Sequence, residues 1–254
     1  MIVDIDSLAG SDYITLIPTK GRGGKIDNVE KLFPYAYLYM NEDEVDDYAG
    51  TTLDIITHKC TKGYAEVLNS IFDMCKLHKI KYAAIFDDDK WKFSCLVGNR
   101  QRDFDSGRTQ EAIENACQIL EDLDENLYLF STASSIIKYQ QNEPVKAGFS
   151  LPQGAMVVRS EKMNKMRVGM HYYEDFDWLM DYIKKNKYII IENRFLCISK
   201  GDLNAGGCNS FRTRKNEESS RTYVKNKWGQ YVNFVRNNSG AIRPTCMKKF
   251  RQKL

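Results

Sequence analysis

The sequence lacks the features that would mark a membrane protein, a secreted protein or a zinc-stabilised one. No apolar run approaches the roughly 20 residues that a bilayer-spanning helix needs. The first residues are acidic, with Asp4 and Asp6, whereas a secretory signal begins with basic and then apolar residues. The seven cysteines stand singly, without a C-x-x-C pair, which argues against zinc ribbons and dithiol redox motifs. We therefore expect reduced thiols, a cytoplasmic location and no membrane partner.

Motifs that would assign a nucleotide site at once are also missing. There is no G-x-x-x-x-G-K-[ST] phosphate-binding loop, and we find neither an internal repeat nor a low-complexity linker. What remains is a chain of 254 residues, 43% hydrophobic and 28% charged, which is ordinary for a folded, water-soluble protein. This length predicts one continuous domain over residues 1–254.

The net charge of +3 hides an uneven distribution along the chain. From Lys200 onward there are 13 Lys and Arg against 3 Asp and Glu, whereas the preceding 199 residues hold 24 against 31. A basic C-terminal segment on an acidic body suggests a polyanionic partner on one side. A solvated basic tail would give the same count, so both interpretations stay open at this point.

Hydrophobic patterning predicts strands that alternate with helices along most of the chain. Strands are expected at residues 13–18, 35–39, 52–57, 80–86, 127–132, 155–159 and 188–191. Helices are expected at residues 64–79, 109–124, 174–186 and 217–232, with a short acidic helix after Asn41 and a loop from Gly201 to Arg214. This order predicts an α/β fold of Rossmann-related type, in which helices flank a mixed, mainly parallel central sheet.

Apolar side chains at helical spacing identify the inward faces of three of these helices. The inward residues are Leu68, Ile71, Phe72 and Cys75 in the first helix, Ile113, Ala116, Leu120 and Leu123 in the second, and Phe176, Leu179 and Ile183 in the third.

Three acids follow the strand at residues 80–86 without a gap: Asp87, Asp88 and Asp89. Adjacent carboxylates repel one another unless a cation or a hydrogen-bonding ligand lies among them. Because alternate side chains of an extended segment point the same way, Asp87 and Asp89 can share a face. Such oxygen ligands suit Mg²⁺ or Mn²⁺ together with a diphosphate, and the ends of strands in α/β sheets are where ligands bind. The alternative is a solvated acidic turn.

A second candidate is the basic, glycine-rich loop that follows the first strand. Lys20 and Arg22 lie there among three glycines, where the backbone can approach a ligand closely. Cations in this position can meet a phosphate or a nucleobase carbonyl. A flexible basic turn is the plainer interpretation.

A third candidate is the acidic start of the helix at residues 174–186. Acids in the first turn are favoured by the helix dipole alone. Here, however, Glu174, Asp175 and Asp177 stand among four aromatic residues and follow His171. A carboxylate walled by aromatic rings can have a raised pKa and act as a general base on a hydroxyl, and Glu174 or Asp175 is the candidate for that role.

A fourth, weaker candidate is the pair Gly206 and Gly207 with Arg212 close behind. Two glycines beside a cation suit a loop that closes over an anionic ligand. An ordinary turn has the same composition.

Taken in order, these pieces resemble the GT-A glycosyltransferases. Residues 17–22, which include Pro18, look like the opening strand and donor-binding loop of that family. Residues 42–48 resemble the short acidic stretch of phage-type members, and residues 63–69 resemble a degraded Gly…Ala-Arg-Asn helix, with Leu68 in place of the arginine. Residues 84–89 match the Asp-x-Asp hallmark, residues 174–177 match the Glu-Asp-x-Asp helix start, and residues 206–212 fit the late glycine loop. The resemblance spans about residues 13–231.

The resemblance implies a nucleotide-sugar transferase, with a UDP-sugar as the expected donor. Asp87 and Asp89 would hold Mn²⁺ or Mg²⁺. The donor would be bound by Pro18, Lys20, Arg22, Asp87, Asp88, Gly206, Gly207 and Arg212. Asp175, or Glu174 beside it, would take the proton from the acceptor hydroxyl, which gives inversion at the sugar carbon.

Within this superfamily the sequence looks most similar to bacteriophage and TET-associated enzymes that add sugars to hydroxymethylated pyrimidines in DNA. Such an enzyme would work in the host cytoplasm on double-stranded DNA, with hydroxymethylcytosine among the acceptor bases. The basic residues expected to follow the DNA phosphates are Arg214, Arg236, Arg243, Lys248 and Lys249.

Three other functions remain open from the sequence. The same chemistry could act on a protein or glycan, with the basic tail incidental. A nucleotidyltransferase also uses paired aspartates with Mg²⁺, but the glycine-rich or Gly-Ser signature that normally precedes its acids is absent near Asp87. A non-enzymatic nucleic-acid-binding protein could retain a decayed transferase fold.

Overall fold

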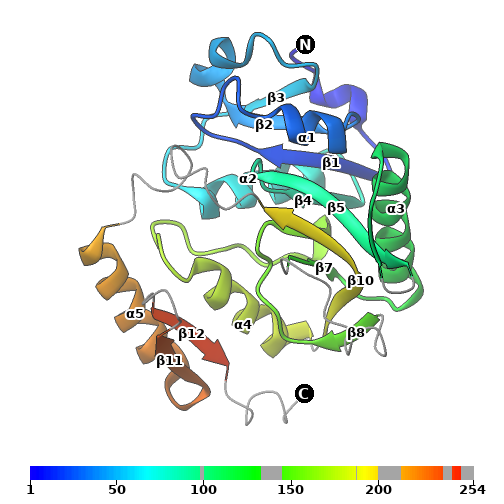
Figure 1. Cartoon of the computed structure of the whole chain (residues 1–254). Helices are drawn as coiled ribbons and strands as arrows, with labels where there is room; N and C mark the ends of the chain where they lie inside the picture. Colours follow the sequence, from blue (N-terminus) through cyan, green and yellow to red (C-terminus); the bar gives the residue numbers. More distant parts are fainter. Residues whose placement is uncertain (98–99, 133–144, 187, 200–212, 237–241, 247–254) are drawn as a thin grey trace.

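The computed structural model describes residues 1–97, 100–132, 145–186, 188–199, 213–236 and 242–246. Its core is a ten-stranded sheet with the strand order β3-β2-β1-β4-β9-β7-β10-β5-β6, and β8 pairs with β10 (Figure 1). The strands are β1 (Tyr13–Pro18), β2 (Tyr37–Asn41), β3 (Asp54–His58), β4 (Tyr82–Phe86), β5 (Lys90–Val97), β6 (Arg100–Asp103), β7 (Leu127–Ser131), β8 (Val145–Gly148), β9 (Ala155–Arg159) and β10 (Ile189–Ser199).

Most strands of this sheet run in one direction. β3, β2, β1 and β4 pair in parallel, and β10 pairs in parallel with β7. β9 lies antiparallel between β4 and β7, while β5 and β8 pair antiparallel with β10. The expected mixed, mainly parallel sheet is therefore confirmed.

Helices cover both faces of the sheet, because each strand alternates its side chains between two apolar clusters. α2 (Tyr64–Leu77) and α4 (Glu174–Asn186) pack on one face, and α1 (Asp27–Leu32) and α3 (Ser106–Asp122) pack on the other. The residues expected to face inward on the first and third predicted helices are all buried. The expectation for Leu123 was wrong, because α3 ends at Asp122 and Leu123 is 54% exposed.

The chain order places a ligand-binding position at the carboxyl ends of β1 and β4. From β1 the chain proceeds outward to β2 and β3, and then returns to the other side of β1 as β4. Connections that leave two neighbouring parallel strands in opposite directions open a crevice at their carboxyl ends. Thr19 follows β1 directly and Asp87 follows β4 directly, so both lie at this crevice.

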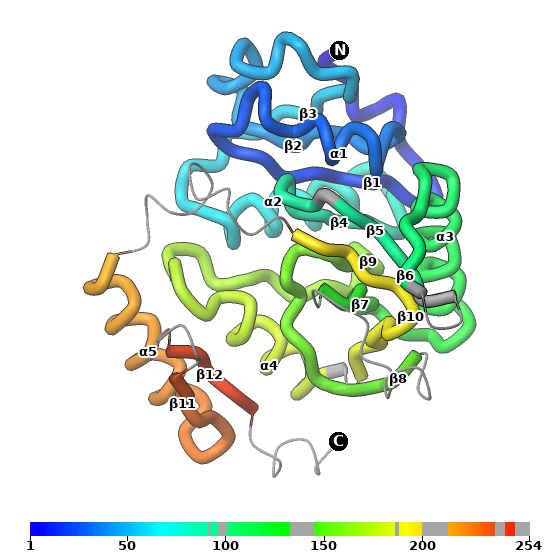
Figure 2. The backbone as a smooth tube through the Cα atoms, in the orientation of Figure 1, coloured from blue at the N-terminus to red at the C-terminus, as the bar shows by residue number. Residues whose placement is uncertain are grey.

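The C-terminal part forms a small module beside α4. It consists of α5 (Arg214–Trp228) and a separate two-stranded sheet of β11 (Val232–Arg236) and β12 (Ile242–Cys246), as Figure 2 shows. Val224, Trp228, Val232 and Cys246 join the apolar cluster that contains α4. Because the sheet covers one side of α4 and this module covers the other, most of the α4 side chains are buried, including the charged Glu174 and Asp177.

Two element boundaries differ from the expectation for identifiable reasons. The helix expected at 217–232 spans Arg214–Trp228, because Thr213 caps its start by accepting from the Asn216 amide and Gly229 (φ +47°) ends it. The strand expected at 188–191 continues to Ser199 through an irregularity after Glu192. The polar residues Glu192 to Arg194 interrupt the apolar pattern there.

All six cysteines in the described part are free, and four of them are buried. Among the described residues, no helix is both long and apolar enough to cross a membrane.

Candidate functional site

Asp87 is held against the loop that precedes β9. Its amide donates to the carbonyl of Gly154 (2.8 Å), and its Oδ1 accepts from the Tyr64 hydroxyl at the start of α2 (3.4 Å). Gly154 has φ +65°, and a Cβ added there would lie 1.7 Å from Asp87 Oδ2. Burial raises the pKa of Asp87, while the Lys90 ammonium opposes that shift. The orientation of the Asp87 carboxylate therefore depends on a glycine at position 154.

Asp88 connects the ends of β1 and β4. Its Oδ2 accepts from Thr19 Oγ1 (2.7 Å), and its Oδ1 pairs with Arg22 Nη1 (2.5 Å). The residue is 8% exposed, and this burial raises its pKa to about 6, against the opposite effects of Thr19 and Arg22. Asp88 therefore fixes the loop after β1.

The acidic 3-10 helix η2 (Glu42–Tyr48) braces the same loop from the other side. Glu44 Oε2 accepts from the amide of Gly21 (2.7 Å), and the Tyr48 hydroxyl accepts from the amide of Arg22 (2.9 Å). Gly23 lies so close to η2 that a Cβ would be 2.1 Å from the carbonyl oxygen of Asp47. The loop that carries Lys20 and Arg22 is thus a fixed structure, with Lys20 exposed at its tip.

Asp89 lies beside a buried lysine. Lys90 is 1% exposed, and its Nζ donates to the carbonyl of Gln153 (2.8 Å) and to Ser199 Oγ (2.7 Å). The same ammonium is 3.9 Å from Asp89 Oδ1. Within the described residues this Oδ1 is buried and has no hydrogen-bond partner. The Lys90 ammonium compensates the charge of Asp89 without a hydrogen bond, so this oxygen can still accept one from a ligand.

The residues present fit a divalent cation shared with a substrate. Among the described residues no group of three or more His, Cys, Asp or Glu is placed to hold a metal by itself. Mg²⁺ is commonly bound by one or two carboxylates, with substrate phosphates and water completing its shell. Asp87 and Asp89 provide that number, and Asp89 Oδ1, which accepts no hydrogen bond within the described residues, is a suitable ligand atom.

The acidic start of α4 lies on the side of the sheet where the parallel strands have their carboxyl ends. α4 leads into β10, which runs parallel to β7, so α4 begins on the side toward which the arrows of β1 and β10 point (Figure 1). Glu174 is 9% exposed, and Asp175 Oδ1 accepts from the amide of Phe176 (2.7 Å). Asp177 instead binds the C-terminal module, accepting from Trp228 Nε1 (2.7 Å) and pairing with Lys227 (2.8 Å).

Asn69 holds the segment that leads to α4. Its Nδ2 donates to the carbonyl of Met166 (2.9 Å), and its Oδ1 accepts from the amide of Met166 (2.7 Å). Asn69 is the last residue of the helix motif named in the resemblance, and its amide satisfies a buried backbone segment. In the structure Asn69 therefore holds the backbone at Met166 in place.

The remaining predicted residues divide into those at the surface of the module and those that are not described. Arg214 is exposed and pairs with Glu218 one turn along α5 (3.0 Å), while Arg236 and Arg243 are exposed on the β11–β12 hairpin. Outside the described residues lie Gly206, Gly207, Arg212, Lys248 and Lys249.

Sequence reasoning missed several residues that build this site. Thr19 and Tyr48 lie within the motif segments 17–22 and 42–48 but were not singled out there, and Lys90 carries no motif. Their roles depend on contacts between distant segments. Gly154 could have been noticed as a glycine just before a strand, but only its contact with Asp87 shows its importance.

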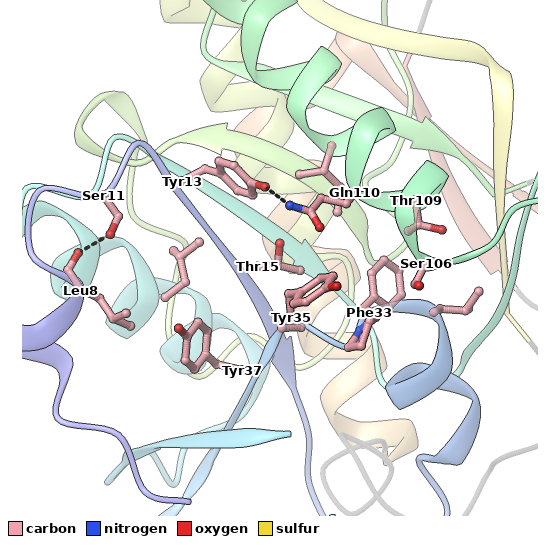
Figure 3. Close-up of a pocket in the computed structure, with 15 residues that line it drawn as sticks. Leu8, Ser11, Tyr13, Thr15, Phe33, Tyr35, Tyr37, Ser106, Thr109 and Gln110 are labelled. Carbon is pink, nitrogen blue, oxygen red and sulfur yellow. Dashed lines mark hydrogen bonds between the residues drawn. The ribbon is translucent and has the colours of Figure 1, made fainter. Parts of the chain in front are cut away.

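A cavity of about 180 Å³ lies elsewhere, near the amino ends of β1 and β2 (Figure 3). Its walls include Tyr13 and Thr15 from the amino end of β1, Tyr37 from the start of β2, and Gln110 from α3. The Tyr13 hydroxyl accepts from the Gln110 amide (3.2 Å) inside it. This position separates the cavity from the acids at the carboxyl ends.

His58, at the end of β3, leads to a prediction about acid stability. Its ring lies 4.8 Å from that of Tyr39, its Nδ1 accepts from the Cys60 amide, and Glu66 and Lys20 are the charged groups that act on it. Burial lowers the pKa of His58 from 6.5 to about 4. As the pH falls from 6.5 to 4, the unfolded chain takes up a proton that the folded imidazole resists, so stability is lost over that interval.

We expect His58 to account for a loss of about 1–3 kcal/mol in unfolding free energy, reduced from the full value because the ring is only half-buried. Urea unfolding of the wild type and His58→Phe at several pH values measures this. The variant should show a shallower loss between pH 6.5 and 4. Equal slopes would show that His58 is not the group responsible.

No family model and no curated protein matches this chain. Among solved structures, it is similar to one described as mannose-1-phosphate geranyltransferase from Thermus thermophilus, with 12% identity and a TM-score of 0.34, over 74% of this chain and 57% of that one. It is also similar to a putative nucleotide-diphospho-sugar transferase from Desulfovibrio desulfuricans, with 8% identity and a TM-score of 0.40, over 84% of this chain and 98% of that one. Likeness of this extent assigns no activity.

Proposed function

We propose that this protein is a nucleotide-sugar-dependent glycosyltransferase of the GT-A type. The observation that carries the proposal is the acid triplet at the crevice between β1 and β4. There Asp88 fixes the loop after β1, and Asp89 retains a buried Oδ1 without a hydrogen-bond partner in the described part of the chain. Such a crevice is where α/β sheets bind nucleotides.

The three acids have different tasks in this proposal. Asp87 and Asp89 would hold a divalent cation, which would supply Lewis-acid charge at the diphosphate of the donor. Asp88 and Arg22 hold the loop after β1 in the shape that receives the nucleotide. Lys20, exposed at the tip of that loop, contributes positive charge toward the donor.

The start of α4 supplies the general base. Asp177 binds Trp228 and Lys227 of the C-terminal module, and Glu174 and Asp175, the two acids that begin α4, are the candidates. The nearly buried Glu174 and its neighbour lie at the carboxyl edge of the sheet, where the donor binds. Removal of the acceptor proton by either carboxylate favours direct attack on the sugar carbon, with inversion.

The proposed acceptor is hydroxymethylated or already glycosylated pyrimidine in double-stranded DNA. Within residues 213–236 and 242–246 the C-terminal module has seven Lys and Arg against two acids, Glu217 and Glu218. Lys215, Arg236 and Arg243 are among its exposed cations, so the charge of its surface is positive. This surface adjoins the helix that carries the candidate base, which favours a polyanionic acceptor.

Mass spectrometry of the reaction products tests the function. The purified protein is incubated with UDP-, GDP-, ADP- and TDP-sugars and Mn²⁺, using plain and hydroxymethylated duplex DNA as acceptors. The proposal expects a gain of one hexose mass on hydroxymethylated DNA alone. Transfer to a protein or glycan would keep the chemistry and refute the acceptor, and transfer of a nucleotide with release of diphosphate would refute the glycosyltransferase assignment.

The salt dependence of DNA binding tests the acceptor surface separately. Arg236→Glu combined with Arg243→Glu should weaken duplex binding by about tenfold or more in 0.1 M salt, because two phosphate contacts become repulsive. Arg102→Glu, on the edge strand β6, is the matched control and should leave binding unchanged. Fluorescence anisotropy measures both. Affinity that does not fall as salt rises would exclude this surface as a phosphate-binding one.

A further inference from the structure

The residue immediately before the candidate base has an uncommon backbone conformation. Tyr173 has φ +63°, the left-handed region that side chains other than glycine rarely adopt. The other two such residues in the described part, Lys79 and Asp124, follow the ends of α2 and α3, where this conformation commonly terminates helices. Tyr173 instead precedes a helix, and its carbonyl accepts from the amide of Asp177 (2.9 Å). The local sequence does not explain its conformation.

The C-terminal module supplies the contacts that hold Tyr173. Its hydroxyl is 3.0 Å from Glu217 Oε1 on α5 and 3.0 Å from the carbonyl of Ile242 on β12. Its ring meets that of Phe234 on β11 edge to face, with centroids 5.6 Å apart. All three elements of the module therefore converge on this one side chain.

The module holds α4 at a second point, three residues beyond the candidate base. Asp177, 3% exposed, accepts from Trp228 Nε1 and pairs with Lys227, which also reaches Asp181 (2.5 Å). Glu174 and Asp175 thus lie between two anchors that belong to the same module. A change in how the module docks would move both carboxylates.

We propose that Tyr173 is the positioning residue through which the C-terminal module sets the geometry of Glu174 and Asp175. The inference rests on the proposed function, because it takes those carboxylates as the base. It adds that the C-terminal module has two tasks. Its surface receives the acceptor, and its contacts hold the carboxylates that deprotonate the acceptor. The base then has its working geometry only when the module is docked through Tyr173.

Tyr173→Phe tests this, because it removes the hydroxyl and keeps the ring. We expect kcat to fall about 10–100-fold, with the KM for the nucleotide sugar unchanged, since the donor residues lie on other elements. Glu217→Gln keeps an acceptor for the hydroxyl and should retain most of the activity. Tyr223→Phe removes a hydroxyl from α5 and keeps the ring that faces Arg167 and Lys227, so it is the matched control.

Hydrogen exchange separates this inference from the proposed function, because it needs no turnover. Tyr173→Phe should speed exchange of the amides of residues 174–178 by about tenfold, and Tyr223→Phe should not. If the wild type transfers no sugar but this exchange result holds, the proposed function fails and the coupling stands. The coupling is refuted if exchange stays unchanged, if both variants behave alike, or if kcat and donor KM worsen together.

Discussion

Replacing Asp89 with asparagine is expected to lower sugar transfer by about a thousandfold, close to 4 kcal/mol in transition-state free energy. The variant keeps the size of the side chain but loses the charge that binds the divalent cation. Asp87→Asn should have a similar effect, because the two carboxylates share that task. Initial rates at saturating Mn²⁺ and nucleotide sugar measure both variants.

Asp73→Asn is the control for the loss of a carboxylate. Asp73 pairs with Lys165 at the surface (2.7 Å) and lies on α2, away from the acid triplet. This variant should transfer sugar at the wild-type rate. Near-normal activity in Asp89→Asn and Asp87→Asn would show that the triplet is an ordinary acidic turn, as the sequence alone allowed.

Gly154→Ala is expected to give the second largest effect, a loss of about a hundredfold in transfer rate. An alanine Cβ at this position would lie 1.7 Å from Asp87 Oδ2, so the carboxylate has to move. The left-handed backbone and the displaced neighbours should together lower the unfolding free energy by about 2–4 kcal/mol. Urea unfolding and initial rates measure the two effects.

Gly10→Ala separates backbone strain from the collision with Asp87. Gly10 also has a positive φ, +77°, but a Cβ there would meet nothing within 4 Å. It should cost about 1–2 kcal/mol in stability and leave transfer unchanged. If Gly154→Ala kept full activity, Asp87 would not need its present orientation, and its role as a ligand would be refuted.

The sequence predicted the architecture well because the central strands are apolar and rich in β-branched and aromatic residues. The strands at Tyr13–Pro18 and Ala155–Arg159 and the helix at Glu174–Asn186 have the expected bounds, since apolar periodicity begins and ends sharply there. β5, β6 and β8 were not expected. All four residues of β6 (Arg100–Asp103) are polar, and its pairing with β5 gives it a strand conformation that its composition does not indicate.

The sequence could predict only those parts of the candidate site that consist of consecutive residues. The sequence shows the acid triplet because it follows a buried strand. It does not show that the three acids make different contacts. Asp88 is bound by Thr19 and Arg22, and Lys90 is buried beside Asp89. Thr19 and Arg22 lie more than 60 residues before Asp88, and the groups that bind the buried Lys90, Gln153 and Ser199, lie more than 60 residues after it. Only the folded sheet brings these segments together.

The C-terminal module illustrates the same limit. The charge count predicted a basic surface, but it did not predict that the module docks on α4 through Tyr173 and Asp177. Aromatic and acidic residues at a helix start have a plain explanation in the helix dipole. Only contacts between distant segments show that Asp177 binds the module.

Calorimetric titration of nucleoside diphosphates into the protein tests the central claim most directly. UDP, GDP, CDP, ADP and TDP are titrated with and without Mn²⁺ into the wild type, Asp89→Asn and Asp73→Asn. The account predicts that at least one diphosphate binds the wild type and Asp73→Asn only with Mn²⁺, and binds Asp89→Asn at least tenfold more weakly. Mn²⁺-independent binding of equal strength in all three proteins, or no binding of any diphosphate to the wild type, would contradict it.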